Sequence, residues 1–181
     1  ELLGSLPAAL DIDALTRATP LDVVKEGVRG GRSFVEIRGS ALFGDFGGRG
    51  WEWVANLLLA GGLYLLYAGV IRWHIPVAML TGLLVPATLL SLVDPATYPS
   101  PAFHLFSGAS MLGAFFIATD PVSAAATVRG RFVYGAGIGL LTYVLRTWGS
   151  YPDGLAFAVL LMNAAVPLID RLTRPRIDGQ R

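Results

Sequence analysis

Thr19 carries the hydroxyl of this chain that is best placed for chemistry. It precedes Pro20, and proline is favoured in the first turn of a helix, where its missing N–H costs nothing. Thr19 is therefore predicted to be the N-cap of a short helix that runs to Glu26, with Asp22 at the third helical position and Gly27 as the stop. The N-terminus of such a helix has free N–H groups and a partial positive charge, which would stabilise a phosphate.

Two interpretations of Thr19 stay open on these residues alone. A plain N-cap is by far the commoner role of a Thr-Pro sequence at this spacing. The alternative is a phosphoester on the Thr19 hydroxyl, seated on the start of the helix. The carboxylate of Asp22 opposes this alternative, because it would lie close to the phosphate.

The composition indicates that Thr19 belongs to a membrane protein. Only 15% of the 181 residues are charged and 54% are hydrophobic, whereas soluble domains have about 25% charged residues. The net charge of +1 gives no argument for nucleic-acid binding. The absence of cysteine excludes disulfides, thiolate-bound iron–sulfur clusters and cysteine nucleophiles within this chain. With two histidines a self-contained zinc site is not expected, and no catalytic residue is assigned.

Five apolar runs follow the polar residues 1–52, and a bilayer core of about 30 Å needs roughly 17–25 apolar residues per helix. We predict an all-α integral membrane protein with an extracytoplasmic segment (1–52), a transmembrane helical domain (53–172) and a cytoplasmic tail (173–181). Because the sequence starts at Glu1 with neither a methionine nor a signal peptide, we expect earlier spans to be missing from it. The predicted spans are Trp53–Ile71, Ile75–Val93, Phe103–Thr119, Phe132–Trp148 and Leu155–Arg171.

The orientation follows from the arginines, which concentrate on the cytoplasmic side of membrane proteins. The short loops on one side of the predicted bundle contain only Arg146. The tail is therefore predicted to be cytoplasmic and Thr19 to lie outside. The other side collects Arg72, Arg129, Arg131, Arg171, Arg174, Arg176 and Arg181.

Small residues in two of the spans are predicted to serve packing. Gly135 and Gly139 lie on one helix face, where they let two helix backbones approach closely. The run Ser107–Ser110 in the third span has two open interpretations. It either packs in the same way or breaks the helix around a ligand, as in transporters.

Asp120 and Asp170 lie at the ends of predicted spans, where ionisable groups are candidates for function. As a hypothesis they line an ion path and neutralise a translocated Na⁺ or H⁺. The alternatives are that they pair with Arg131 or Arg171, or that they are simply hydrated at the membrane surface.

The pattern Asp13-x-x-Thr16-x-Ala18-Thr19 resembles the flavinylation motif in the D subunit of the Rnf ion-translocating oxidoreductase complex. A related protein is the B subunit of the sodium-pumping NADH:quinone oxidoreductase. In this family the last threonine of the motif holds FMN through a phosphoester, so the resemblance implies covalent FMN on Thr19. Arg17 stands where related motifs often have glycine. The resemblance extends over roughly residues 11–178, with its most specific stretches at Met111–Val122, Tyr151–Gly154 and Pro167–Asp170.

The resemblance also implies a setting. The chain would be the C-terminal half of a ten-helix bundle in the bacterial inner membrane, with Thr19 on the periplasmic side. Its partners would be membrane lipid, a flavin transferase and the other subunits of the complex, including a second flavin-bearing one. A second, non-covalent flavin such as riboflavin is left open. The implied function is electron transfer between NADH and ferredoxin, coupled to Na⁺ or H⁺ transport.

Two alternatives to this function remain. One is a subunit of a quinone-reducing sodium pump, which quinone reduction by the purified complex would reveal. The other is a permease or channel-like module without a redox role, for which the glycine-rich spans are the only sequence support. Measurement of bound flavin separates the permease alternative from the two redox functions, because only the redox functions require flavin.

Overall fold

The computed structural model describes residues 19–39, 43–44, 47–48 and 50–174. Within these ranges every regular element is helical, and one isolated β-bridge joins Phe43 to Gly48. The predicted all-α class is thereby confirmed for this part of the chain. The elements are α2 (Pro20–Arg29), α3 (Phe34–Arg38), α4 (Trp51–Tyr67), α5 (His74–Val93), α6 (Pro101–Phe106), α7 (Ser110–Leu112), the π-helix η1 (Gly113–Ile117), α8 (Val128–Trp148) and α9 (Leu155–Thr173).

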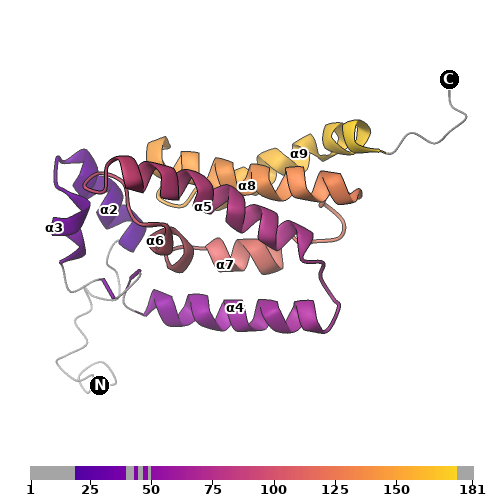
Figure 1. Ribbon diagram of the computed structural model, residues 1–181, viewed down its shortest axis with the longest axis horizontal. Coiled ribbons are helices and arrows are strands. Elements are labelled where there is room, and N and C mark those ends of the chain that lie inside the picture. Colours follow the sequence, from indigo (N-terminus) through magenta and orange to yellow (C-terminus); the bar gives the residue numbers. More distant parts are fainter. Residues whose placement is uncertain (1–18, 40–42, 45–46, 49, 175–181) are drawn as a thin grey trace, which may run out of the picture.

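The long helices form a bundle, and the two short N-terminal helices cover one of its ends (Figure 1). Helix α8 packs against both α5 and α9, while α4 reaches the bundle through α6, α7 and η1. In Figure 1, α6 and α7 lie between α4 and the layer of α5 and α8. The helices α2 and α3 pack together over the end of the bundle where α6 begins.

Glycines allow α5 and α8 to approach each other closely, as the sequence predicts for Gly135 and Gly139. A β-carbon at Gly139 would lie 2.0 Å from the carbonyl oxygen of Met79, and one at Gly135 would lie 2.7 Å from that of Ile75. Any larger residue would push the two backbones apart. Close backbone approach through small residues is a common basis of helix association in membranes.

The third apolar run is not one continuous helix. Helix α6 ends at Phe106, and Gly108 has a φ of +69°, in the left-handed region that favours glycine. The chain then resumes as α7 and continues into η1. The structure therefore shows a helix break at Ser107–Ser110, and a ligand at this break stays a prediction. Ser107 and Ser110 are both fully buried at this break.

Among the described residues, α5 and α9 are long and apolar enough to cross a membrane. Helix α4 has 17 residues, the third run is divided by its break, and α8 carries arginines at both ends. Length and composition therefore make α5 and α9 candidate membrane-crossing helices. The expectation of five spans remains a prediction.

Helix α2 differs from its prediction at its C-terminal end. It extends to Arg29 and is capped by Gly30, so the predicted stop at Gly27 is wrong. Gly27 is buried inside the helix because α3 packs onto it: a β-carbon there would lie 2.5 Å from Cδ1 of Ile37. Tertiary contact with α3, which local sequence signals cannot report, explains this glycine.

Candidate functional site

Thr19 is the N-cap of α2, as the sequence predicts. Its exposed side chain forms a reciprocal capping box with Asp22, the third residue of the helix. The Thr19 hydroxyl donates to Oδ2 of Asp22 at 2.7 Å, and the Asp22 N–H donates to the Thr19 Oγ at 3.3 Å. The other members of the predicted motif, Asp13, Thr16 and Ala18, lie outside the described residues.

Two cations fix α2 to the C-terminal end of α8. Lys25 Nζ donates to the carbonyl oxygens of Leu145, at 3.2 Å, and Tyr151. Arg29 Nη2 donates to the carbonyl oxygen of Gly149 at 2.8 Å. Positive side chains are stabilised at a helix C-terminus, where the last carbonyls are free. Burial and the neighbouring Arg29 lower the pKa of Lys25 below its ordinary value. These bonds hold the helix that begins at Thr19 in one position on the bundle.

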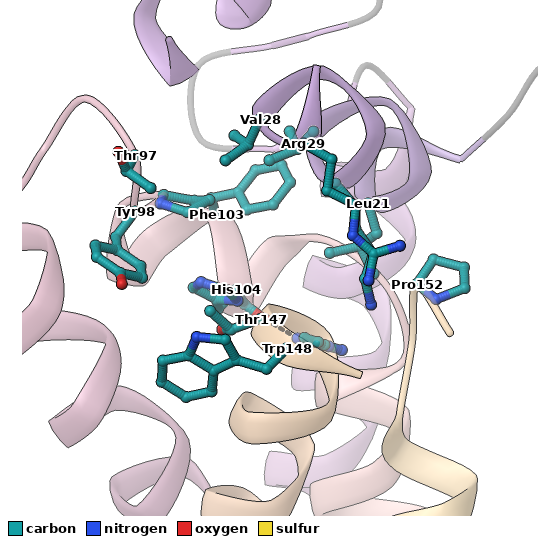
Figure 2. Close-up of a pocket in the computed structure, with 14 residues that line it drawn as sticks. Leu21, Val28, Arg29, Thr97, Tyr98, Phe103, His104, Thr147, Trp148 and Pro152 are labelled. Atoms are coloured by element: carbon teal, nitrogen blue, oxygen red, sulfur yellow. Dashed lines mark hydrogen bonds between the residues drawn. The ribbon is translucent and has the colours of Figure 1, made fainter. Parts of the chain in front are cut away.

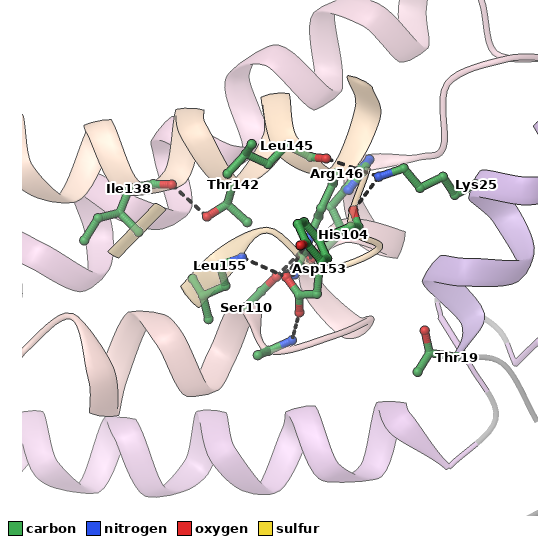
Figure 3. Close-up of polar contacts among 12 residues, drawn as sticks. Thr19, Lys25, His104, Ser110, Ile138, Thr142, Leu145, Arg146, Asp153 and Leu155 are labelled. Atoms are coloured by element: carbon green, nitrogen blue, oxygen red, sulfur yellow. Dashed lines mark hydrogen bonds and ion pairs between the residues drawn. The ribbon is translucent and has the colours of Figure 1, made fainter. Parts of the chain in front are cut away.

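Arg146 is the centre of a polar cluster at the break between α6 and α7 (Figure 3). Its side chain is almost fully buried and forms an ion pair with Asp153 at 3.0 Å. Arg146 Nη1 also donates to the carbonyl oxygen of His104 and to Oγ of Ser110, each at 2.9 Å. This arginine therefore ties the end of α6 to the start of α7, across the residues that interrupt the helix.

Asp153 completes the cluster from the loop between α8 and α9. Its carboxylate accepts the backbone N–H of Ala109 at 2.8 Å and that of Leu155 at 3.2 Å, besides the guanidinium of Arg146. Burial by itself would raise the pKa of Asp153, but Arg146 and the two N–H donors outweigh burial. The pKa of Asp153 therefore lies below its ordinary value, and the carboxylate is charged at neutral pH.

Replacing Gly108 by alanine should destabilise the protein by more than the strain of a positive φ alone, because the new side chain would also collide with the cluster. A β-carbon there would lie 2.5 Å from Oδ2 of Asp153 and 2.5 Å from Cδ1 of Leu21. Gly69 is a matched control, since it has a φ of +71° with no atom within 4 Å of a β-carbon. We expect Gly69→Ala to cost about 1–2 kcal/mol, and Gly108→Ala to cost about 1–3 kcal/mol more through overpacking. Thermal unfolding of the purified protein in detergent measures the difference, and equal losses would contradict the packing argument.

A cavity of about 210 Å³ lies between the inner face of α2 and the ends of α6 and α8 (Figure 2). One water requires only roughly 10–15 Å³, so the cavity has room for a much larger group. Its walls combine aromatic rings with cations, and Figure 2 shows the rings of Tyr98, Phe103, His104 and Trp148 around the space. The cationic side chains of its lining are Lys25, Arg29 and Arg146.

The burial of the His104 ring in the wall of this cavity is not predicted by its position in the sequence. A histidine near a membrane surface is expected to be hydrated or hydrogen-bonded, yet His104 is 3% exposed. Neither ring nitrogen has a hydrogen-bond partner among the described residues. Its ring instead packs edge-on against Tyr143, with 5.1 Å between the ring centroids.

The candidate ion-path residues Asp120 and Asp170 are not part of this site. Asp120 accepts hydrogen bonds from the N–H and the hydroxyl of Ser123, and Asp170 accepts the N–H of Ala126. Among the described residues neither aspartate forms an ion pair with Arg131 or Arg171, which was one of the alternatives left open. The bond with Ser123 holds the pKa of Asp120 below its ordinary value. The loop after η1 and the C-terminal part of α9, which contain these aspartates, lie at the other end of the bundle from α2 (Figure 1).

Comparison with known proteins gives the chain a consistent set of relatives. The profile of the NQR2, RnfD, RnfE family matches residues 2–179. The D subunit of the ion-translocating oxidoreductase complex of Aliivibrio salmonicida (strain LFI1238) is 54% identical over 172 residues, which are 95% of this chain and 49% of the relative. The protein of the same name from Vibrio vulnificus (strain YJ016) is 55% identical over 168 residues, or 93% of this chain and 47% of the relative.

A third relative extends the similarity to another genus. The D subunit of the corresponding complex of Aeromonas salmonicida (strain A449) is 56% identical over 170 residues, which are 94% of this chain and 49% of that protein. The chain thus spans about half the length of the curated relatives that it matches.

Proposed function

Because the chain belongs to the NQR2, RnfD, RnfE family, we propose that it is part of a membrane subunit of an ion-translocating electron-transport complex, with FMN bound covalently to Thr19. The relatives are named as the D subunit of an ion-translocating oxidoreductase complex, which supports the type of complex. The exposed Thr19 hydroxyl at the start of a helix that is fixed to the bundle is the observation that supports the attachment point.

The N–H groups at the start of α2 suit a phosphoester on Thr19, whereas the carboxylate of Asp22, 2.7 Å from the Thr19 hydroxyl oxygen, opposes it. The N–H groups of Leu21 and Asp22 lie at the start of α2, where no preceding helical turn supplies carbonyl acceptors. A phosphate on Oγ would find these donors and the positive end of the helix. Esterification removes the hydroxyl hydrogen, so the bond that Thr19 now donates to Asp22 would be lost. The capping N–H of Asp22 can still donate to the ester oxygen.

The bound flavin would supply the redox chemistry, accepting and donating electrons. The chain's own residues would hold it in place. Lys25 and Arg29 fasten α2 to the end of α8, and the Arg146–Asp153 pair stabilises the helix break on which the start of α2 rests. A fixed position matters, because electron transfer to a second flavin in a neighbouring protein of the complex requires a constant distance between the cofactors.

We further propose that Thr19 lies on the periplasmic side of the bacterial inner membrane and the tail of the chain in the cytoplasm. The excess of arginines on the other side of the bundle supports this orientation. Partners would be the remaining subunits of the complex, a flavin transferase that forms the ester, and lipid around α5 and α9. Electrons would pass between the NADH and ferredoxin sides.

Coupling to Na⁺ or H⁺ would use Asp120 and Asp170 at the opposite end of the bundle. If Asp120 neutralises a translocated ion, Asp120→Asn should lower ion transport per electron at least several-fold. Transport by vesicles that contain the purified complex measures this ratio, with electron transfer measured in parallel. The control is Asp94→Asn, because Asp94 forms its hydrogen bonds with Ala96 and Thr97, within its own turn. Unchanged coupling in Asp120→Asn would leave Asp120 with its turn-forming role alone.

Flavin fluorescence of the denatured protein tests the redox function. The protein is expressed with and without a flavin transferase, and the denatured chain is separated on a gel. Covalent FMN predicts a fluorescent band only when the transferase is present. A chain without flavin under both conditions would contradict the proposal and favour the permease alternative, for which the helix break at Gly108 is the structural support.

A further inference from the structure

His104 and Tyr143 leave polar atoms without partners at one place between α6 and α8. Both ring nitrogens of His104 and the hydroxyl oxygen of Tyr143 are buried and lack hydrogen-bond partners among the described residues. A neutral imidazole has one donor and one acceptor. Burial of such groups without partners is unfavourable, and native proteins usually avoid it. His104 lines the cavity, so a ligand with a polar edge in that space would supply the partners that its ring lacks.

The cavity that His104 lines is suited to a flat aromatic ligand. Phe103 and Trp148 contribute ring surfaces to its wall, and aromatic rings stack on one another or meet edge to face. Lys25 and Arg29 line the α2 side of the same cavity. These cations would stabilise negative charge on a ligand in this half-open cavity, where electrostatic interactions are stronger than in bulk water.

The cavity also extends towards the proposed point of flavin attachment. Its α2 wall begins at Leu21, two residues after Thr19, and continues on the same helix face through Val24 and Val28. A group held by Thr19 can therefore enter the cavity from the N-terminal end of α2. The carbonyl bonds of Lys25 and Arg29 keep this helix over the cavity.

From this geometry we infer that the cavity between α2 and α8 receives the isoalloxazine ring of the Thr19-linked flavin, with His104 hydrogen-bonded to the polar pyrimidine edge of the ring. This inference rests on the proposed function. The neighbouring cations favour the more negative, reduced form of the ring, and so does a hydrogen bond donated by His104. The cavity thereby raises the reduction potential of the flavin.

Substitution of His104 tests the inference in the purified full-length complex. His104→Leu removes both ring nitrogens, and His104→Gln retains a donor and an acceptor. We expect His104→Leu to keep covalent FMN by mass but to lower its midpoint potential by about 30 mV, which corresponds to a tenfold change in the equilibrium constant of a two-electron couple. His104→Gln should restore most of the shift. The visible absorption bands of the flavin should move in the same order.

The chain provides a matched control, because it contains only one other histidine. His74 also has a buried ring nitrogen without a partner among the described residues, but it stacks on Trp73 at the start of α5 and does not line the cavity. His74→Leu should leave the midpoint potential unchanged. Wild-type potential and spectrum in a flavinylated His104→Leu protein would overturn the inference, and so would equal shifts in both variants.

A measurement on the wild-type complex covers the case in which His104→Leu does not fold. A ring inside the cavity should be protected from iodide, so that its fluorescence is quenched several-fold less than that of free FMN. Quenching as strong as that of free FMN would overturn the inference while leaving the attachment to Thr19 intact. A wild-type chain with no flavin mass would instead remove the proposed function itself, and the inference with it.

Discussion

Thr19→Ala is expected to abolish covalent flavin completely. The substitution removes the only oxygen to which the phosphate can be esterified at this position, and no neighbouring side chain of α2 before Lys25 carries a hydroxyl. Flavin fluorescence of the denatured protein, expressed with a flavin transferase, should fall to the level of the background. Electron transfer through the complex should fall with it.

Loss of the N-cap complicates Thr19→Ala, and a second variant separates the two effects. Alanine at this position also costs about 1 kcal/mol of helix stability. Thr19→Asn keeps a capping side chain but has no hydroxyl, so it should be as stable as wild type and equally free of flavin. Thr19→Ser should retain flavin, because it keeps the hydroxyl. Flavin retained in Thr19→Asn would contradict the assignment of the attachment point.

Asp153→Asn is expected to cause a large loss of stability, about 3–5 kcal/mol, which is typical of removing one partner of a buried ion pair. The variant leaves the guanidinium of Arg146 buried with no counter-charge. Asparagine has a single acceptor oxygen, so it can replace either Oδ1, which binds Leu155 N–H and Arg146, or Oδ2, which binds Ala109 N–H. The loss therefore combines the missing charge with a lost backbone hydrogen bond. Denaturant unfolding in detergent measures it. Asp94→Asn is the control, because Asp94 has no ion pair with an arginine among the described residues and its hydrogen bonds stay within one turn.

The pH dependence of this difference has a definite sign. The folded-state pKa of Asp153 lies below the unfolded value, which is about 3.9. Its stabilising contribution is therefore complete above the unfolded pKa and is lost as the pH falls through the folded pKa. The stability difference between wild type and Asp153→Asn should be constant from about pH 5 to 7 and shrink below about pH 4. A difference that grows in acid would exclude the carboxylate as its source.

Local sequence signals predicted the elements around Thr19 well, because caps depend on neighbouring residues. Thr19, Pro20 and Asp22 occupy the predicted positions in a capping box. The packing glycines Gly135 and Gly139 were also predictable, since their spacing places them on one helix face. The apolar runs located the long helices, because the length and composition of a run can be read directly from the sequence.

The polar cluster was not predicted, because its members come together only through tertiary structure. The orientation argument treats Arg146 as a loop charge, but Arg146 is buried and binds Asp153 and the end of α6. Its position inside an apolar run, seven residues before an aspartate, was the available signal. The lack of hydrogen-bond partners for the His104 ring also depends on packing between distant segments. The same holds for the extension of α2 beyond Gly27, where Ile37 of α3 packs on the glycine.

Peptide mass mapping tests covalent flavin on Thr19 most directly. Trypsin cleaves after Arg17 and Lys25, and the resulting peptide Ala18–Lys25 contains Thr19 as its only hydroxyl residue. In protein expressed with a flavin transferase, this peptide should gain the mass of FMN less one water, the balance of ester formation. The unmodified peptide together with no flavin elsewhere in the chain, or a flavin mass on another peptide, would contradict the account.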